Sequence, residues 1–156
     1  MQLNYIANTF VMSSSGKTIP VIDPSDGQLF DEIQRSNASD IDSAVSAARE
    51  GLELVWQRLG AAERGRLLMR LSAKVAQHAD ELALIEQRDC GKPTQQARAD
   101  VAALVRYLEF YAGACDKLHG ETIPYQNGYS VMTWREPHGV TGHIIPWTRS
   151  YPSRSR

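Results

Sequence analysis

The sequence predicts an α/β fold in which short strands come first, amphipathic helices follow, and extended structure returns near the end. Three observations predict it. Short apolar or alternating segments precede residue 35, apolar positions recur at spacings of three and four between residues 39 and 118, and Val140 to Ile145 form a brief apolar run. Such a run is typical of a strand buried on both faces, as in a parallel sheet. With 156 residues, 42% of them hydrophobic, the chain suits about one domain with its own core.

The first part of the chain is expected to form four short strands. Asp23-Pro24 ends the third strand and Ser25-Asp26-Gly27 turns the chain, because proline cannot donate to a ladder and glycine accepts the conformations of tight turns. The expected strands are Leu3–Ile6, Thr9–Met12, Thr18–Ile22 and Leu29–Gln34.

Four helices are expected to follow. Ser39 is the expected N-cap of the first helix, with Asp42 completing a pattern like a capping box. Gly91, with Pro93 just beyond it, ends the third helix, since this is the usual order at a helix stop. The first helix carries an apolar stripe made of Ile41, Val45, Ala48, Leu52 and Val55, and the remaining helices are expected at 61–77, 80–88 and 94–118. Each stripe requires an apolar surface to pack against.

Extended structure is expected again after Gly120. Residues 129–134 alternate in part, Pro137-His138-Gly139 turns the chain, and the run from Val140 to Ile145 is the one candidate for a strand of a parallel sheet. A single strand does not make a sheet, so the predicted α/β fold is incomplete.

The charge balance and hydropathy of the chain argue against two classes of binding partner, nucleic acids and membranes. The chain has 17 basic and 18 acidic residues, so it lacks the positive field with which nucleic-acid-binding proteins displace counterions. No segment approaches the roughly 20 apolar residues that span a bilayer. The uncharged stretch from Met1 to Gly16 is interrupted by polar side chains, unlike a signal peptide. We therefore expect no nucleic acid, no membrane and a cytoplasmic location, with Cys90 and Cys115 reduced.

Local motifs for chemistry are weak. The four histidines are scattered and neither cysteine lies in a CxxC pair, so no metal cluster is indicated. Cys90 is a candidate nucleophile because Lys92 can lower a thiol pKa, but Asp89 and the end of a helix act in the opposite direction. Cys115 is interpreted as a packed residue of the fourth helix. The Gly139 to Gly142 segment lacks the spacing of a phosphate-binding loop.

Longer motifs are more informative than these single residues. They are Trp134 to Trp147, Val21-Ile22-Asp23-Pro24 with Gly27, Ala62-Glu63-Arg64 with Leu67 and Leu68, Asp89-Cys90-Gly91-Lys92-Pro93, and Tyr107 to Gly113. In this order and spacing the chain resembles the N-terminal part of the aldehyde dehydrogenase superfamily. The resemblance implies edge strands and helices that lead into the first strand of a Rossmann-like domain.

The resemblance also implies a function. Family members oxidise an aldehyde to a carboxylic acid with NAD or NADP, using a cysteine thiolate and a glutamate that activates water. It implies that Ile144, Ile145, Pro146 and Trp147 line the nicotinamide side of the cofactor site. It also implies a monovalent-cation site made of the Val21 and Ile22 carbonyls with the Asp89 carboxylate, although a hydrogen bond at the helix end is the alternative role for Asp89.

The sequence departs from the family pattern at Thr148, where the family has an asparagine that helps to hold the oxyanion. We divide the chain into a family region, residues 1–147, and a basic tail, residues 148–156. The family's nucleophilic cysteine and glutamate base are not in the sequence. We therefore expect a truncated or frameshifted fragment that is inactive alone and that self-associates or binds chaperones through exposed apolar helix faces. The alternative is a non-catalytic interaction protein that uses the same faces to bind a full-length relative or another partner.

Overall fold

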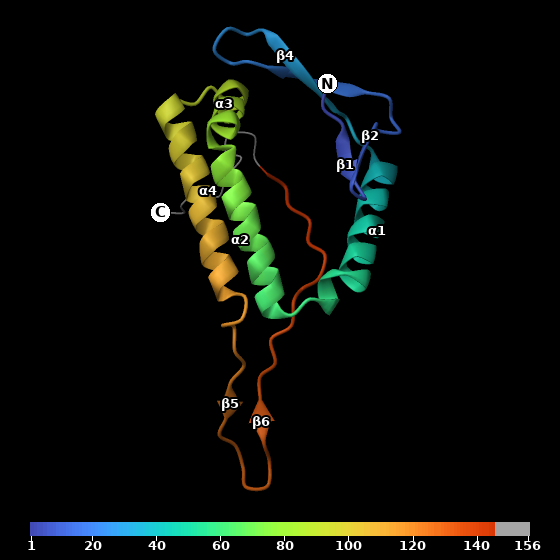
Figure 1. Cartoon of the computed structure of the whole chain (residues 1–156). Coiled ribbons are helices and arrows are strands. Elements are labelled where there is room, and N and C mark those ends of the chain that lie inside the picture. The colour runs from blue at the N-terminus through green and yellow to red at the C-terminus, as the bar shows by residue number, and fades with distance from the viewer. Residues whose placement is uncertain (146–156) are drawn as a thin grey trace.

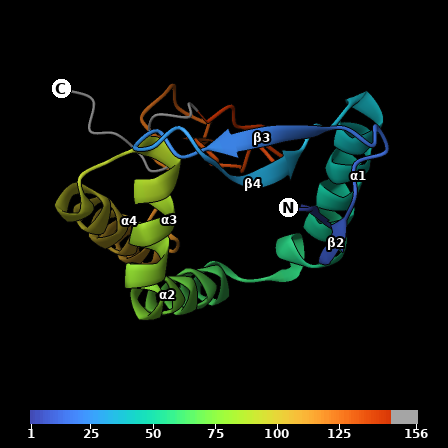
Figure 2. The same cartoon turned by 90° about the horizontal axis from the view of Figure 1, so that it is seen from above.

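The computed structural model describes residues 1–145, in which short strands come first, helices follow and extended structure returns, in the predicted order (Figure 1). Two regions lie side by side when the molecule is seen from above (Figure 2). The hairpin region comprises β1 (Asn4–Ile6), β2 (Thr9–Val11), β3 (Thr18–Ile22), β4 (Leu29–Gln34) and α1 (Ala38–Leu54). The helical region comprises α2 (Ala61–Gln77), α3 (Ala79–Cys90) and α4 (Thr94–Ala114), and a 3-10 turn, Trp56–Arg58, precedes it.

The strands of the hairpin region pair as two antiparallel hairpins, β1 with β2 and β3 with β4. Ala7 and Asn8 both have positive φ, which suits the tight two-residue turn between β1 and β2. The β3–β4 ladder has a bulge because Val21 pairs with Asp31 and Ile22 pairs with Leu29, which leaves Phe30 as the extra residue. Strands β3 and β4 have the predicted bounds.

The N-cap of α1 is Asn37, so the prediction of Ser39 with Asp42 is wrong by two residues. Asn37 accepts a hydrogen bond from the Asp40 backbone N–H at 3.2 Å, and the Asp40 carboxylate accepts one from the Asn37 N–H at 2.9 Å. Asn37 and Asp40 therefore form the capping box two residues earlier. The Asp40 carboxylate gains a further bond from the Ser13 hydroxyl at 2.6 Å, which Asp42 does not have.

The core lies in the helical region, where small residues let the helices approach closely. Ala83, Ala97 and Val101 are buried, and Val75, Ala79 and Leu82 pack against them. Helices α2 and α4 meet at Gly65, where an added Cβ would lie 2.6 Å from the Ala112 carbonyl oxygen. Ser72 Oγ bridges the same helices by donating to the Val105 carbonyl at 3.1 Å. Gly91 ends α3 in the left-handed conformation, as predicted.

After α4 the structure differs from the prediction. The helix ends at Ala114 rather than near residue 118. A short strand β5 (Thr122–Ile123), which was not predicted, pairs with β6 (Val131–Met132), and this hairpin projects away from both regions (Figure 1). Only two residues of the expected strand 129–134 have a partner, because β5 offers no more.

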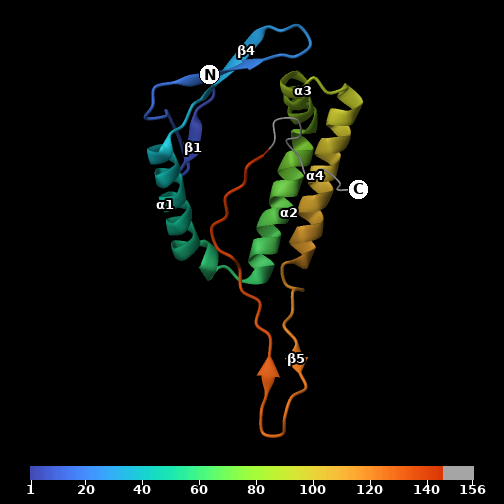
Figure 3. The ribbon, with the colours of Figure 1, turned by 180° about the vertical axis from the view of Figure 1, so that it is seen from behind.

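The apolar run from Val140 to Ile145 is not a strand, and its residues are exposed, so the prediction of a strand buried on both faces is wrong for this structure. Residues 133–145 run between α1 and α2 without joining a ladder (Figure 3). A strand exists through hydrogen bonds to a neighbour, and no other strand within residues 1–145 lies beside this segment. None of the helices within the same residues has the length and apolar content needed to cross a membrane.

Candidate functional site

The segment expected to contact the nicotinamide is open to solvent. Ile144 is fully exposed and Ile145 is 62% exposed. The segment passes close to α1 at one point, since a Cβ added to Gly139 would lie 3.5 Å from Leu52 Cδ2. Pro146, Trp147 and Thr148 lie outside the described residues. Of the expected cofactor residues, the structure therefore places two, both as accessible apolar side chains on an extended backbone.

The expected cation site lies at a seam where the β3–β4 hairpin touches the end of α3. Arg88 Nε is 3.6 Å from Asp23 Oδ2, and the Arg88 guanidinium lies 4.5 Å from the centre of the Phe30 ring. An added Cβ at Gly91 would meet Pro24 Cγ at 2.8 Å. The seam therefore brings the turn that follows Val21 and Ile22 to the helix end that carries Asp89.

The chemistry of Asp89 suits a cation. Its half-buried carboxylate takes part in none of the ion pairs within residues 1–145, and it accepts a weak bond from the Cys90 thiol at 3.8 Å. Burial raises the pKa of Asp89, the Cys90 contact lowers it, and the negative charge of Glu86 raises it further. A positive ion beside Asp89 would offset the unfavourable burial of its negative charge. Carboxylate and carbonyl oxygens are the ligands of hard cations.

Side chains alone do not form a metal centre. Within the described residues, no group of three or more His, Cys, Asp and Glu side chains could hold a metal ion. Any cation at the seam would therefore depend on backbone carbonyls such as those of Val21 and Ile22.

Neither cysteine has the surroundings of a nucleophile. Burial raises the pKa of the Cys90 thiol, the negative charges of Glu86 and Asp89 raise it further, and Lys92 only partly opposes them. Cys115 caps the end of α4 and its thiol donates to the Tyr111 carbonyl at 3.2 Å. The prediction that Cys115 is a packed helix residue is therefore corrected to a half-buried cap, since α4 ends before it.

Sequence reasoning missed a buried ion cluster. Lys92 Nζ bonds to the Glu86 carboxylate and lies 3.1 Å from Asp100 Oδ2, and Glu86 is only 3% exposed. Burial alone would lower the pKa of Lys92, but the two carboxylates outweigh it and the net change is upward. Lys92 is thus paired with these acids, and its charge only partly offsets the rise that burial, Glu86 and Asp89 cause in the pKa of Cys90. The signal available in the sequence was a lysine between Gly91 and Pro93, six residues after Glu86 and eight residues before Asp100, with these acids on two predicted helices.

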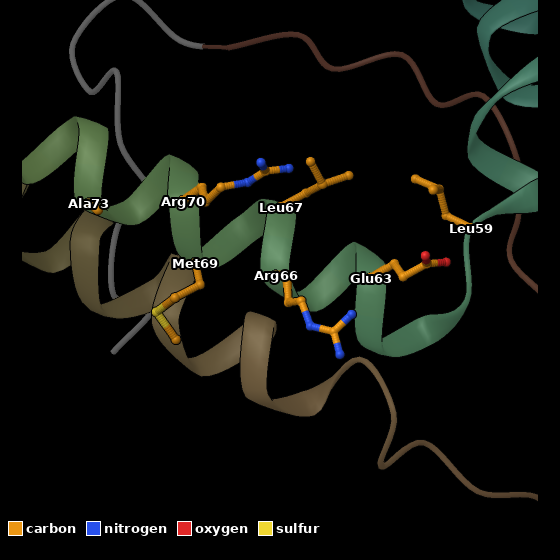
Figure 4. Close-up of a pocket in the computed structure, with 7 residues that line it drawn as sticks. All are labelled: Leu59, Glu63, Arg66, Leu67, Met69, Arg70 and Ala73. Atoms are coloured by element: carbon orange, nitrogen blue, oxygen red, sulfur yellow. The ribbon is translucent and has the colours of Figure 1, made fainter.

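A pocket within residues 1–145 lies on α2 and holds none of the residues expected to bind cofactor or cation (Figure 4). Its lining is apolar, with charged side chains among it: Leu59, Glu63, Arg66, Leu67, Met69, Arg70 and Ala73. It contains no pair of groups suited to acid–base or nucleophilic chemistry.

The short hairpins, the capped helix, the three-helix core and the exposed apolar segment form part of an α/β fold and do not make up a complete active site. The chain belongs to the aldehyde dehydrogenase family, whose family model matches residues 10–151. This confirms the family and the fold inferred from the sequence motifs.

The relatives are dehydrogenases of several organisms. A mitochondrial aldehyde dehydrogenase of Arabidopsis thaliana, family 2 member B4, is 44% identical over 91% of this chain and 27% of its own length. A hydroxyisobutyraldehyde dehydrogenase of Mycolicibacterium austroafricanum is 43% identical over 96% of this chain and 29% of its own length. The chain therefore spans between a quarter and a third of these relatives.

Solved structures give the same result. A Burkholderia cenocepacia protein solved as a candidate aldehyde dehydrogenase is 61% identical, with a TM-score of 0.90 over 93% of this chain and 30% of that one. The structure of PnpE in complex with nicotinamide adenine dinucleotide is 37% identical, with a TM-score of 0.77 over 83% of this chain and 26% of that one. The mixed helix and strand structure is thus a partial, N-terminal region of the family fold.

Proposed function

We propose that this chain forms the N-terminal region of an enzyme that oxidises an aldehyde to a carboxylic acid with NAD or NADP. The observation that carries the proposal is the 61% identity at a TM-score of 0.90 to a candidate aldehyde dehydrogenase. The complex of PnpE with its dinucleotide supports a nicotinamide cofactor. The family match continues to residue 151, so the division between residues 147 and 148 rests on Thr148 and stays a prediction.

In this proposal Ile144, Ile145, Pro146 and Trp147 contact the nicotinamide side of the cofactor. Ile144 and Ile145 fit that role because they are apolar and accessible, as contact with a flat ring requires. The cofactor, when bound, supplies the acceptor for the hydride. These side chains orient the ring and exclude water, and they move no proton.

A second part of the proposal concerns the seam. The Val21 and Ile22 carbonyls and the Asp89 carboxylate bind a monovalent cation that ties the end of β3 to the end of α3. The support is the contact between the two elements and the uncompensated charge of Asp89. We expect wild-type protein to melt at a higher temperature in potassium chloride than in choline chloride at equal ionic strength. The Asp89→Asn variant should show no such difference, and the same shift in both proteins would rule the site out.

We propose that the 156-residue chain does not oxidise aldehydes alone. Burial and the charges of Glu86 and Asp89 disfavour the Cys90 thiolate, the Cys115 thiol donates to the Tyr111 carbonyl, and no glutamate follows Glu136 in the sequence. The test follows reduced cofactor by absorbance with several aldehydes and both dinucleotides, on wild-type and Thr148→Asn protein. Both should give the buffer rate, because an oxyanion donor has no effect without a nucleophile. Turnover that disappears in a Cys90→Ser, Cys115→Ser double variant would overturn the proposal of inactivity.

Dinucleotide binding should also be weak. Residues 139–145 join no sheet, and their only polar side chains are Thr141 and His143, which bond to each other at 3.1 Å. We expect a dissociation constant no tighter than about 1 mM, or about −4 kcal/mol. Titration calorimetry with NAD and NADP measures it, and a micromolar value would contradict this estimate.

A further inference from the structure

The buried ion cluster of Lys92 lies in the link between two helices, next to the expected cation site. Gly91, Lys92 and Pro93 join the end of α3 to the start of α4, and Asp89 is in the last turn of α3. The end of β3 and the turn after it lie beside α3 (Figure 2), and an added Cβ at Gly91 would lie 2.8 Å from Pro24 Cγ. The link that carries Lys92 is therefore part of the seam.

Lys92 connects this link to both helices. Its ammonium group bonds to the Glu86 carboxylate of α3 and lies 3.1 Å from Asp100 Oδ2 of α4. The side chain of Lys92 is 13% exposed and that of Glu86 is 3% exposed, so solvent screens the attraction between them only weakly. Because its two partners are on different helices, Lys92 restricts how the end of α3 is oriented relative to α4.

The cluster also compensates a charge that lies close to Asp89. Glu86 is near enough to Asp89 for its negative charge to raise the pKa of the Asp89 carboxyl. Lys92 provides Glu86 with a positive partner, whereas Asp89 takes part in none of the ion pairs within residues 1–145. The arrangement thus leaves Asp89 available to a cation while the charge of its neighbour is neutralised.

We propose that Lys92 is a positioning residue for the cation site, because it clamps the end of α3 through its partners on the two helices. The Asp89 carboxylate is thereby held facing the carbonyls of Val21 and Ile22. This inference rests on the cation site proposed above. Lys92 carries a positive charge and is not a ligand, so its effect on the cation is indirect. Groups that orient the ligands of a metal typically contribute roughly tenfold to a hundredfold to its affinity.

The test measures how potassium stabilises variants of the 156-residue chain. Melting temperatures are recorded across a potassium chloride series, with choline chloride keeping the ionic strength constant. In Lys92→Met the apparent dissociation constant for potassium should rise at least about tenfold. Asp100→Asn keeps the pair of Lys92 with Glu86 but weakens the tie to α4, and its constant should also rise.

Lower stability alone does not produce this result. Stabilisation by a ligand depends on the ratio of its concentration to its dissociation constant, so a less stable protein with an intact site keeps its response to potassium. Arg98→Met is the matched control, because Arg98 Nη2 lies 3.2 Å from Asp80 Oδ1 and this pair also joins α4 to α3. Asp80 is in the first turn of α3, at the opposite end from Asp89. The response of Arg98→Met to potassium should therefore equal that of the wild type.

Hydrogen exchange gives a second, local measurement. The Gly91 N–H donates to the Gln87 carbonyl at 2.8 Å at the end of α3. Potassium should slow exchange at this N–H in the wild type and in Arg98→Met, and it should slow it less in Asp100→Asn. This comparison decides the question if Lys92→Met does not fold.

The outcomes separate the role of Lys92 from the cation site itself. A wild-type protein without any response to potassium would overturn both proposals. A response that disappears in Asp89→Asn but is unchanged in Lys92→Met, or in Asp100→Asn if Lys92→Met does not fold, would leave the cation site in place and overturn the role of Lys92.

Discussion

The helical region and the hairpin region are stabilised in different ways. In the helical region, Ala83, Ala97 and Val101 are buried in an apolar core, and a buried ion cluster closes its end. In the hairpin region the buried residues are mostly polar: Ser13, Gln34 and Asp40, with Val21 as the apolar exception. Packing of small residues thus stabilises one region, and hydrogen bonds to a carboxylate stabilise the other.

Because of this difference, different kinds of change destabilise the two regions. The helical region responds to changes of volume and to uncompensated buried charge. The hairpin region responds to pH, because its central acceptor is the Asp40 carboxylate, which receives bonds from the Ser13 hydroxyl and the Ser14 and Asn37 backbone N–H groups. The following changes test the contrast, beginning with the largest expected effect.

The largest effect is expected from Lys92→Met. The change leaves Glu86, which is 3% exposed, without its positive partner. Removing one member of a buried pair costs about 3–5 kcal/mol. Chemical denaturation followed by circular dichroism measures the loss. Arg98→Met is the matched control, since its partner Asp80 is 85% exposed and such pairs contribute about 0–1 kcal/mol. Equal losses in the two variants would contradict the role given to the buried cluster.

Gly65→Ala is the second change. The added Cβ would lie 2.6 Å from the Ala112 carbonyl oxygen, so α2 and α4 must move apart. Overpacking of this kind costs about 1–3 kcal/mol. Gly113→Ala in α4 is the control, because nothing lies within 4 Å of its added Cβ and alanine favours the helix by about 0.5–1 kcal/mol. The two melting temperatures should therefore shift in opposite directions, and a Gly65→Ala protein that melts at or above the wild type would refute the close approach.

The sequence predicts the helical region better than the segments after it. The apolar spacing of Leu67, Leu68, Leu71 and Val75 predicted α2 at its observed bounds, because helix periodicity is local. The N-cap of α1 was misplaced because Ser13, which is distant in sequence, selects Asp40 over Asp42. Val140 to Ile145 has the composition of a buried strand, but burial and strand pairing require a neighbour that local patterns cannot supply. The Lys92 cluster was missed for the same reason, since it joins separate elements, and the seam was implied only through the family resemblance, which groups Val21 and Ile22 with Asp89.

The third test lowers the pH and measures how the stability of the hairpin region responds. Hydrogen bonds from Ser13, Ser14 and Asn37 hold the pKa of Asp40 well below its usual value, and the N-terminal amino group and Gln2 lower the pKa of Asp31 to about 2. A depressed folded pKa contributes stability above about pH 4, and this stability is lost as the pH falls through the folded value. The melting temperature should therefore drop as the solution is acidified below about pH 4.

Asp40→Asn should lower stability at neutral pH and flatten this acid dependence. Asp42→Asn, which alters a carboxylate without a hydrogen bond or ion pair within the described residues, should leave the curve unchanged. Melts from neutral pH down to about pH 2 measure both variants. An unchanged slope in Asp40→Asn would show that another group governs acid unfolding.

The smallest effect is expected at the seam that joins the two regions. Arg88→Ala removes both the contact with Asp23 at 3.6 Å and the interaction with the Phe30 ring. A half-exposed pair and an exposed cation–π contact together contribute about 0.5–1 kcal/mol. The loss of stability should be local, because neither contact touches the core of α2–α4.

Hydrogen exchange measures whether the effect of Arg88→Ala is local. Exchange should quicken at the Asp23 N–H, which bonds to the Gln28 carbonyl at 2.9 Å, and stay constant in the middle of α4. Arg106→Ala, which removes an exposed ion pair within α4, should leave exchange at Asp23 unchanged. If Arg88→Ala instead quickened exchange throughout α4, the two regions would form a single cooperative unit, and the contrast between them would not describe how the chain unfolds.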